Sequence, residues 1–190
     1  MARQREFDKN IALERIKNTF WRLGYVGTSI SDLEEATGLK KQSLYRVFKS
    51  KKQMYLAALN DYESVEINDA FNRLDGPEPA QLKFKRMFDY VIDSVFSSKD
   101  KRGCFFCNAI ADQSQLDVEI GAFIKSCYER ILNRFVKTLE AELPYKKDQN
   151  SSFKKASQIL MSYIGLRLMI KADVNSDRLM QSIDLAIQTI

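Results

Sequence analysis

A short stretch in the first third of the chain carries cationic, amide and hydroxyl side chains at the spacing of one helix face. These groups belong to Lys40, Lys41, Gln42, Ser43, Tyr45 and Arg46. Leu44, Val47 and Phe48 share the opposite face of the helix that we expect from Lys40 to Phe48. A narrow helix with this supply of donors fits the major groove of DNA, where each base pair presents a distinct pattern of donors and acceptors.

The residues before this helix predict a second short helix and a sharp turn. Ile30, Leu33 and Ala36 recur at helical spacing, which predicts a helix over Ser29 to Thr37. Gly38 follows and supplies the backbone freedom that a tight turn requires. Two short helices joined in this way form the framework of a helix-turn-helix motif.

The residues after it predict a helix that begins with a phosphate-binding end. Ser50 and Gln53 form a Ser-x-x-Gln capping box, so the next helix is expected to begin at Lys51. The exposed N–H groups and the positive dipole end of that helix suit a phosphate. Its apolar residues continue to Leu74, so this helix joins a head to a body.

Five short motifs follow one another between Asn10 and Leu59. They are Gly24-Tyr25, Thr28-Ser29-Ile30, Ala36-x-Gly38-Leu39, Ser43-Leu44-Tyr45-x-x-Phe48 and Ser50-Lys51-x-x-x-Tyr55. In order and spacing they resemble the N-terminal signature of TetR-type transcriptional regulators. Lys40 and Gln42 depart from it, because the family often has Ser or Thr at the first position and Gly or Ala at the second. Both differences alter the surface that faces the groove.

The resemblance implies a role in DNA binding for particular residues. Thr28 and Ser29 are expected at a phosphate near the first short helix, and Tyr45 and Lys51 at other backbone phosphates. Bases are expected to meet Lys41, Gln42 and Ser43, and Lys40 and Arg46 complete the predicted DNA-binding set. A Gln42–adenine or a Lys41–guanine pair contributes about 1–3 kcal/mol of discrimination.

Composition predicts an all-α chain of 190 residues with a basic head. Seven glycines and three prolines are few, and no run shows the strict alternation of strands, so helix is expected to dominate, with about nine helices along the chain. We expect them at 9–23, 29–37, 40–48, 51–74, 80–97, 103–113, 117–143, 152–172 and 177–190. Residues 1–60 hold twelve Lys and Arg against six Asp and Glu, whereas the remainder holds eighteen against nineteen. This asymmetry suggests a polyanion-binding domain over 1–52 and a different task for 53–190.

Several classes of function are disfavoured by what the sequence lacks. Without histidine, Ser-His and Cys-His catalysis and His-based zinc sites are excluded, so we expect neither an enzyme nor a cofactor. The most apolar stretch, Ile159 to Ile170, is too short for a bilayer and contains Arg167. We expect a cytoplasmic protein without a membrane partner, and three cysteines fit a reducing compartment. Arg3 and Arg5 lie in an expected flexible arm, either DNA-contacting or functionless.

The body is expected to bind a small molecule and a second copy of the chain. The resemblance implies an effector pocket, for which the candidate lining is Phe88, Phe105, Phe106, Tyr128, Phe135 and Tyr163. Each of these aromatics is alternatively ordinary core. The last two helices are apolar enough to form a four-helix interface in a homodimer; the alternative is that both are internal. The partners expected are therefore an operator in double-stranded DNA, an unidentified effector and a second subunit.

A Cys-x-x-Cys pair adds an alternative. Cys104 and Cys107 lie in an apolar segment beside Arg102, so a redox- or electrophile-sensing regulator is one reading and a thiol oxidoreductase another. Buried inert cysteines are the ordinary outcome. A helical scaffold that has lost DNA binding is a further reading. A transcriptional regulator, most simply a repressor released by its effector, accounts best for the polar helix face.

Overall fold

The structure is a computed structural model that describes residues 8–98, 100, 102–113, 117–142, 145–172, 174–188 and 190. All the regular secondary structure of the described residues is helical. The helices are α1 (Lys9–Gly27), α2 (Ile30–Thr37), α3 (Lys41–Phe48), α4 (Lys51–Tyr62), α5 (Asn68–Phe71), α6 (Ala80–Ser98), α7 (Phe105–Gln113), α8 (Val118–Glu140), α9 (Gln149–Lys171) and α10 (Ser176–Ile187). The all-α prediction is confirmed. Arg3 and Arg5, in the expected N-terminal arm, lie outside the described residues.

One long helix connects the two ends of the molecule. It runs from α4 through a π-helical segment, η1 (Glu63–Ile67), into α5 and a final 3-10 turn, η2 (Asn72–Leu74). Counted as one helix, this run corresponds to the predicted 51–74 element and gives the described chain the nine helices expected. The wide π turn is a feature that occurs frequently at functional sites.

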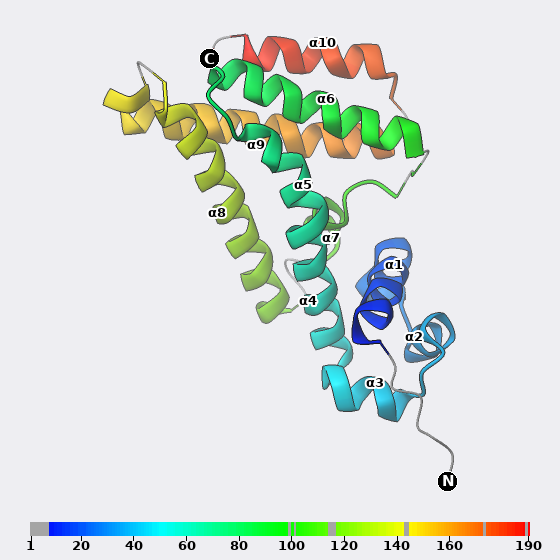
Figure 1. Cartoon of the computed structure of the whole chain (residues 1–190). Coiled ribbons are helices and arrows are strands. Elements are labelled where there is room, and N and C mark those ends of the chain that lie inside the picture. The colour runs from blue at the N-terminus through cyan, green and yellow to red at the C-terminus, as the bar shows by residue number, and fades with distance from the viewer. Residues whose placement is uncertain are drawn as a thin grey trace.

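The helices form a small head and a larger body (Figure 1). The head contains α1, α2 and α3, with α3 leading directly into α4. The body contains a layer of α6, α9 and α10, toward which α8 and the long helix both extend. The expected boundary after residue 52 falls in the first turn of α4, so this helix belongs to both parts.

The helix boundaries follow from local capping chemistry. Side chains that accept backbone N–H groups at helix starts are Asp8, Ser29, Ser50, Asp117, Asp148 and Asn175. Because Asp148 caps α9, this helix begins at Gln149, three residues earlier than predicted. Gly24 has a φ of +71°, which interrupts α1 where the sequence predicted its end. A short helical segment, 25–27, follows the kink and leads to α2.

A continuous core of aromatic side chains joins the head to the body. In α7, the ring of Phe105 lies 5.5 Å from Tyr55 and 5.8 Å from Tyr62 on α4, and 6.2 Å from Trp21 on α1. Deeper in the body, Phe135 meets several other aromatic rings at edge-to-face angles. Such contacts stabilise by about 0.5–1.5 kcal/mol per pair beyond their area burial, so they help to hold α7 against the head.

No described helix combines the length and hydrophobicity needed to cross a membrane.

Candidate nucleic-acid interface

Helix α2 is fixed at both ends by short-range hydrogen bonds. At its start, Ser29 Oγ accepts the Asp32 N–H at 3.1 Å, while the Ser29 N–H donates to Asp32 Oδ2 at 2.7 Å. Hydrogen bonds from Ser29 lower the pKa of the Asp32 carboxyl, so the cap stays charged at neutral pH. At its end, Gly38 adopts a left-handed conformation and donates its N–H to Glu34 O at 2.8 Å. The turn into α3 is therefore well defined.

Helix α3 begins with an unusual cap. Lys40 occupies the N-cap position but offers no side-chain acceptor. The Glu34 carboxylate instead accepts the Lys41 N–H at 2.8 Å from the preceding helix. An acidic group at this end also faces the positive pole of the helix dipole. The carboxylate therefore supplies the cap that Ser or Thr provides in many helices.

One side of α3 is anchored and the other is free. Leu44 and Phe48 are buried in the core of the head. Exposed positions on the other side are Lys40, Lys41, Gln42 and Arg46, with Ser43 and Tyr45 partly buried. The Lys41 ammonium lies 5.7 Å from the centre of the Tyr45 ring, which helps to hold both side chains above the surface. The predicted groove-facing surface therefore exists as an exposed polar helix face.

A strained turn sets the angle between α3 and α4. Lys49 has a φ of +71° and a ψ of −50°, and the Ser50 N–H donates to Phe48 O at 2.9 Å across it. These values define a γ-turn, a rare conformation for a residue with a Cβ atom. Strain of this kind is concentrated at functional sites. Helix α4 begins two residues after Lys49, at Lys51.

The N-terminus of α4 retains exposed backbone donors beside a cation. Ser50 Oγ accepts the Gln53 N–H at 3.1 Å. The Lys51 ammonium lies 4.7 Å from the centre of the Tyr25 ring, and burial lowers its pKa. Helix dipole, free N–H groups and ammonium together make this end favourable for an anion.

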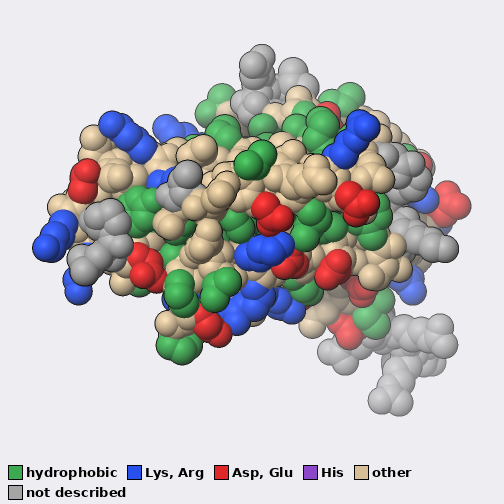
Figure 2. All heavy atoms as spheres, turned by 90° about the horizontal axis from the view of Figure 1, so that it is seen from above, with side chains coloured by type: hydrophobic (Ala, Val, Ile, Leu, Met, Phe, Trp, Pro, Cys, Tyr) green, Lys and Arg blue, Asp and Glu red, His purple; other side chains and the backbone are tan. Residues whose placement is uncertain are grey.

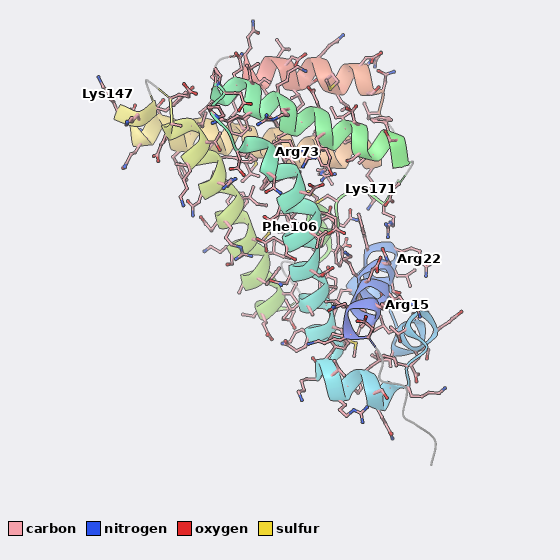
Figure 3. All side chains as sticks on the ribbon, viewed as in Figure 1. Arg15, Arg22, Arg73, Phe106, Lys147 and Lys171 are labelled. Carbon is pink, nitrogen blue, oxygen red and sulfur yellow. The ribbon has the colours of Figure 1, made fainter. Side chains whose placement is uncertain are left out.

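The structure corrects one predicted contact. Thr28 is only 1% exposed, and its hydroxyl donates to Gly24 O at 2.7 Å. Its side chain closes the turn between α1 and α2 and is unavailable to a phosphate. Ser29, the neighbouring candidate, is exposed. Arg15 and Arg22 on α1 add positive charge to the head (Figure 3).

The six aromatic side chains predicted to line an effector pocket are placed differently. All but Tyr128 are buried at 2% exposure or less, and they pack against other aromatics as core. An open cleft of about 830 Å³ lies instead between the long helix and α8. The predicted residues are absent from its lining, and two of the lining pairs, Glu63–Arg130 and Asp75–Arg134, already form ion pairs. The lining prediction is therefore wrong for this cleft.

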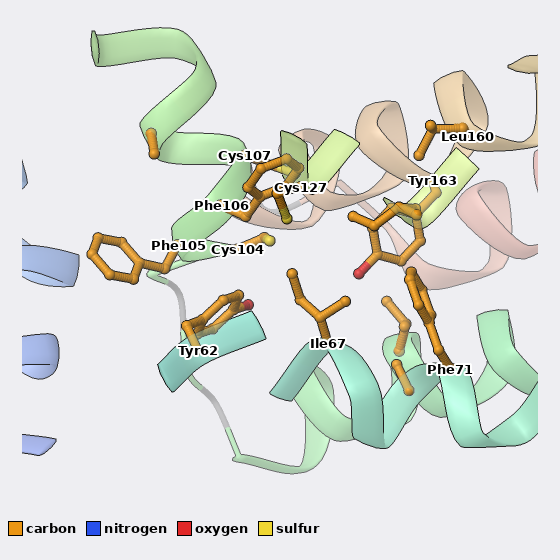
Figure 4. Packing of buried hydrophobic residues seen from close by; sticks show 14 of the residues in the cluster. Tyr62, Ile67, Phe71, Cys104, Phe105, Phe106, Cys107, Cys127, Leu160 and Tyr163 are labelled. Atoms are coloured by element: carbon orange, nitrogen blue, oxygen red, sulfur yellow. The ribbon is translucent and has the colours of Figure 1, made fainter. Parts of the chain in front are cut away.

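The thiols lie in the same core as the aromatic rings (Figure 4). Cys104, Cys107 and Cys127 are all free and buried. Burial opposes ionisation of Cys104, but hydrogen bonding with Cys107 and the charge of Arg167 outweigh it and lower its pKa to about 6. The same interaction raises the pKa of Cys107. One thiol of the pair therefore has thiolate character and the other remains protonated.

The C-terminal layer exposes hydrophobic side chains. On α9, Phe153, Met161 and Leu168 are 52%, 52% and 39% exposed, and on α10 Leu185 is 69% exposed. Viewed from above, apolar side chains reach the surface of this layer among charged ones (Figure 2). Both helices bury their opposite faces, so neither is wholly internal.

Comparison with known proteins agrees with the geometry of the head. A family model described as "Bacterial regulatory proteins, tetR family" matches residues 12–58. The HTH-type transcriptional repressor ComR of Escherichia coli (strain K12) is 33% identical over 147 residues, which cover 71% of this chain and 66% of ComR. The HTH-type transcriptional regulator YezE of Bacillus subtilis (strain 168) is 24% identical over the full length of both proteins.

Solved structures share the fold over nearly the whole chain. The regulator CifR, as a cysteine mutant in complex with 26-bp double-strand operator DNA, has a TM-score of 0.87 at 23% identity, covering 98% of both chains. A regulator from Legionella pneumophila has a TM-score of 0.80 at 21% identity, covering 98% of this chain and 100% of the other.

Proposed function

The chain belongs to the tetR family of bacterial regulatory proteins, and from this premise we propose that it is a homodimeric repressor that a small molecule releases from its operator. As a family member it is a DNA-binding transcriptional regulator. Such a protein acts at DNA without catalysing a reaction, and we place it in the cytoplasm, where bacterial DNA is.

The observation that carries the proposal is the surface of α3. Its exposed lysine, glutamine and arginine groups stand on a helix whose other side is locked in the core. A helix of this width enters the major groove and presents such groups to base edges. The capped turn before it and the γ-turn after it hold the helix at a fixed angle.

We assign different tasks to the polar residues of the head. Lys41, Gln42 and Ser43, at the start of α3, face the bases. Phosphates of the DNA backbone meet the exposed Ser29 and the N-terminus of α4 at Lys51. Phosphate contacts fix the register of the protein, whereas base contacts determine the sequence that is bound. Tyr45, Lys40 and Arg46 flank both groups and complete the contact surface.

Two features favour a dimer: the short contact that one α3 helix makes with DNA, and the exposed apolar side chains of α9 and α10. One eight-residue helix reads too few bases to locate a site in a genome, and a second head doubles the contacts. The exposed apolar side chains of α9 and α10 supply a surface on which two copies pair about a two-fold axis. We propose that this surface is the dimer interface.

We propose that the connection between head and body allows an effector to release the protein from its operator. ComR is described as a repressor, which favours the same sign of regulation here. An effector reduces DNA binding only if it prefers the conformation in which the two heads do not fit the operator. The aromatic contacts of Phe105 with α1 and α4 provide a connection through which such a preference reaches the head.

Selection of bound sites from random double-stranded DNA tests the function. We expect enrichment of a sequence with two related half-sites. Lys51→Ala is expected to weaken binding to selected and unrelated DNA alike and to reduce the salt dependence, because it removes a phosphate contact. Lys125→Ala, on the exposed surface of α8, is the control. Failure to enrich any sequence contradicts the proposal.

A second candidate function is regulation through the thiol pair, and the lowered pKa of Cys104 beside Cys107 favours it. Oxidation by peroxide joins the two sulfurs as a disulfide, with loss of two protons and two electrons to the peroxide, which is reduced to water. Mass spectrometry after mild peroxide treatment is expected to show a loss of two mass units within the peptide that contains both cysteines. Unmodified thiols and unchanged DNA binding contradict this function.

A further inference from the structure

A partly open cavity of about 250 Å³ lies where the head meets the body. Its walls come from α1, the long helix, α6 and α9, and the π-helical segment η1 contributes Val65 and Glu66. At the volume that a molecule occupies in liquid water, roughly 30 Å³, it holds about eight waters or one small metabolite. It is smaller and more enclosed than the cleft beside α8.

Two residues that line this cavity each hold a buried polar atom without a hydrogen-bond partner within the described chain. These atoms are the indole Nε1 of Trp21 and Oε2 of Glu66, both fully covered from solvent. Glu66 Oε1 is used differently, because it pairs with the Lys17 ammonium at 2.8 Å. A buried donor or acceptor without a partner costs about 1–3 kcal/mol, so each atom calls for a group that the chain does not provide.

The opposite wall carries a buried cation. Arg167 is 7% exposed, and within the described residues its one hydrogen bond runs from Nε to Tyr163 Oη at 3.3 Å. Tyr163, Tyr62 and Cys104 are among the groups that interact most strongly with its charge. A guanidinium has five N–H donors. Within the described residues, Tyr163 accepts from one of these donors, and the others are open to an anion in the cavity that Arg167 lines.

The arrangement is complementary to a molecule with two different ends. Arg167 and the Trp21 N–H are donors, which suit a carboxylate. Glu66 Oε2 is an anionic acceptor without a partner, whereas Asp69, which also lines this side of the cavity, already pairs with Arg73 and Tyr90. Glu66 Oε2 therefore suits an ammonium or a hydroxyl.

We propose that the cavity binds a small amino acid or hydroxy acid, with its carboxylate on Arg167 and Trp21 and its ammonium or hydroxyl on Glu66. This inference rests on the proposed function, because it identifies the chemical class and the site of the effector. The larger cleft is less suitable, since Glu63–Arg130 and Asp75–Arg134 already satisfy its charges.

The position of the site explains how binding reaches DNA. Trp21 and Lys17 belong to α1 of the head, and Lys17 holds Asp61 and Glu66 of the long helix at 2.8 Å each. A ligand that joins Trp21 to Arg167 and neutralises Glu66 changes the contacts that fix α1 against the body. It therefore favours one angle of the head over another, which is the requirement for coupling.

The fluorescence of Trp21 provides a direct assay, because it is the single tryptophan of the chain. The reduced full-length protein is titrated with the standard amino acids, lactate and malate, and each acid is compared with its amide. We expect at least one acid to change the Trp21 emission and to raise the Tm, and its amide to do neither. Ligand that binds only the folded state stabilises in proportion to RT ln(1 + [L]/Kd).

Variants separate the two ends of the ligand. Glu66→Gln is expected to weaken binding of the responding acid by about 10- to 100-fold, the value of a charged hydrogen bond. Arg167→Met is expected to abolish the response, and if it fails to fold, Glu66→Gln decides alone. Glu129→Gln, exposed on α8 and outside the cavity, is the matched control.

The inference fails if no acid changes emission or Tm, if an amide acts as well as its acid, or if Glu66→Gln binds like wild type. Because these readouts need no DNA, a protein that selects an operator but ignores every acid contradicts only this inference. Loss of operator selection, in contrast, contradicts the proposed function.

Discussion

Removing the Glu34 carboxylate tests whether a side chain from the preceding helix holds the first turn of α3. The Lys41 N–H donates to Glu34 Oε1 at 2.8 Å, while the N-cap residue, Lys40, makes no side-chain cap. Loss of an N-cap interaction costs about 0.5–2 kcal/mol, typically near 1. In a protein of this size, 1 kcal/mol corresponds to roughly 2–4 °C in Tm. We therefore expect Glu34→Ala to lower the Tm by about that amount.

Two further variants make the test specific. Glu35→Ala removes the same charge from an exposed neighbouring position of α2 and is expected to leave the Tm nearly unchanged. Lys40→Ser supplies an acceptor at the N-cap, so Glu34→Ala combined with Lys40→Ser is expected to recover most of the loss. Melting is followed by circular dichroism. Equal Tm values for the Glu34 and Glu35 variants, or no recovery in the double variant, refute this account of the cap.

Three other predictions concern the turn, the dimer and the thiols. Lys49→Gly is expected to raise the free energy of unfolding by about 1 kcal/mol, because glycine adopts positive φ without strain. Urea denaturation measures this change. An unchanged urea midpoint argues against strain at Lys49. Leu168→Glu is expected to convert dimers to 22.0-kDa monomers in light scattering, whereas exposed Lys125→Glu leaves the dimer intact; dimers in both variants place the interface elsewhere. The pKa of Cys104 in the folded protein, about 6, lies below its value in the unfolded chain. Ionised Cys104 therefore stabilises the folded protein fully above the unfolded pKa, and this stabilisation is lost as the pH falls toward 6. The excess stability of wild type over Cys104→Ser in urea is therefore expected to grow from pH 6 to pH 9, while the raised pKa of Cys127 predicts the opposite trend for Cys127→Ser.

The helices and the polar face of α3 were predictable because their signals are local. Apolar residues at helical spacing placed Leu44 and Phe48 inside, and both are buried. Ser50 was recognised as the cap of α4 from the Ser-x-x-Gln spacing, since this cap depends on a residue only three positions away. The break at Gly24 was likewise visible in the sequence.

Contacts that depend on three-dimensional approach were not predictable. The Glu34 cap joins residues on two different helices across a turn, and nothing in the spacing distinguishes Glu34 from Glu35. Thr28 has the residue type of a phosphate ligand, but its hydroxyl turns back to Gly24 O. The γ-turn at Lys49 carries no sequence signal, because a glycine would be expected there.

Cavities were the least predictable feature. Helical spacing shows that an aromatic side chain faces inward, but it does not show whether it meets another side chain or empty space. The predicted pocket aromatics therefore turned out to be packed core. Arg167 was noted only as an argument against a membrane span, although it lines the cavity at the head–body junction.

The central claim is that the exposed face of α3 reads bases, and the base preference of a Gln42→Ala variant tests it most directly. Sites are selected from random DNA with wild type and variant in parallel, and the two preference profiles are compared position by position. We expect the variant to lose discrimination of about 1–3 kcal/mol at one base pair in each half-site and to retain the other preferences. An identical profile for both proteins contradicts the claim.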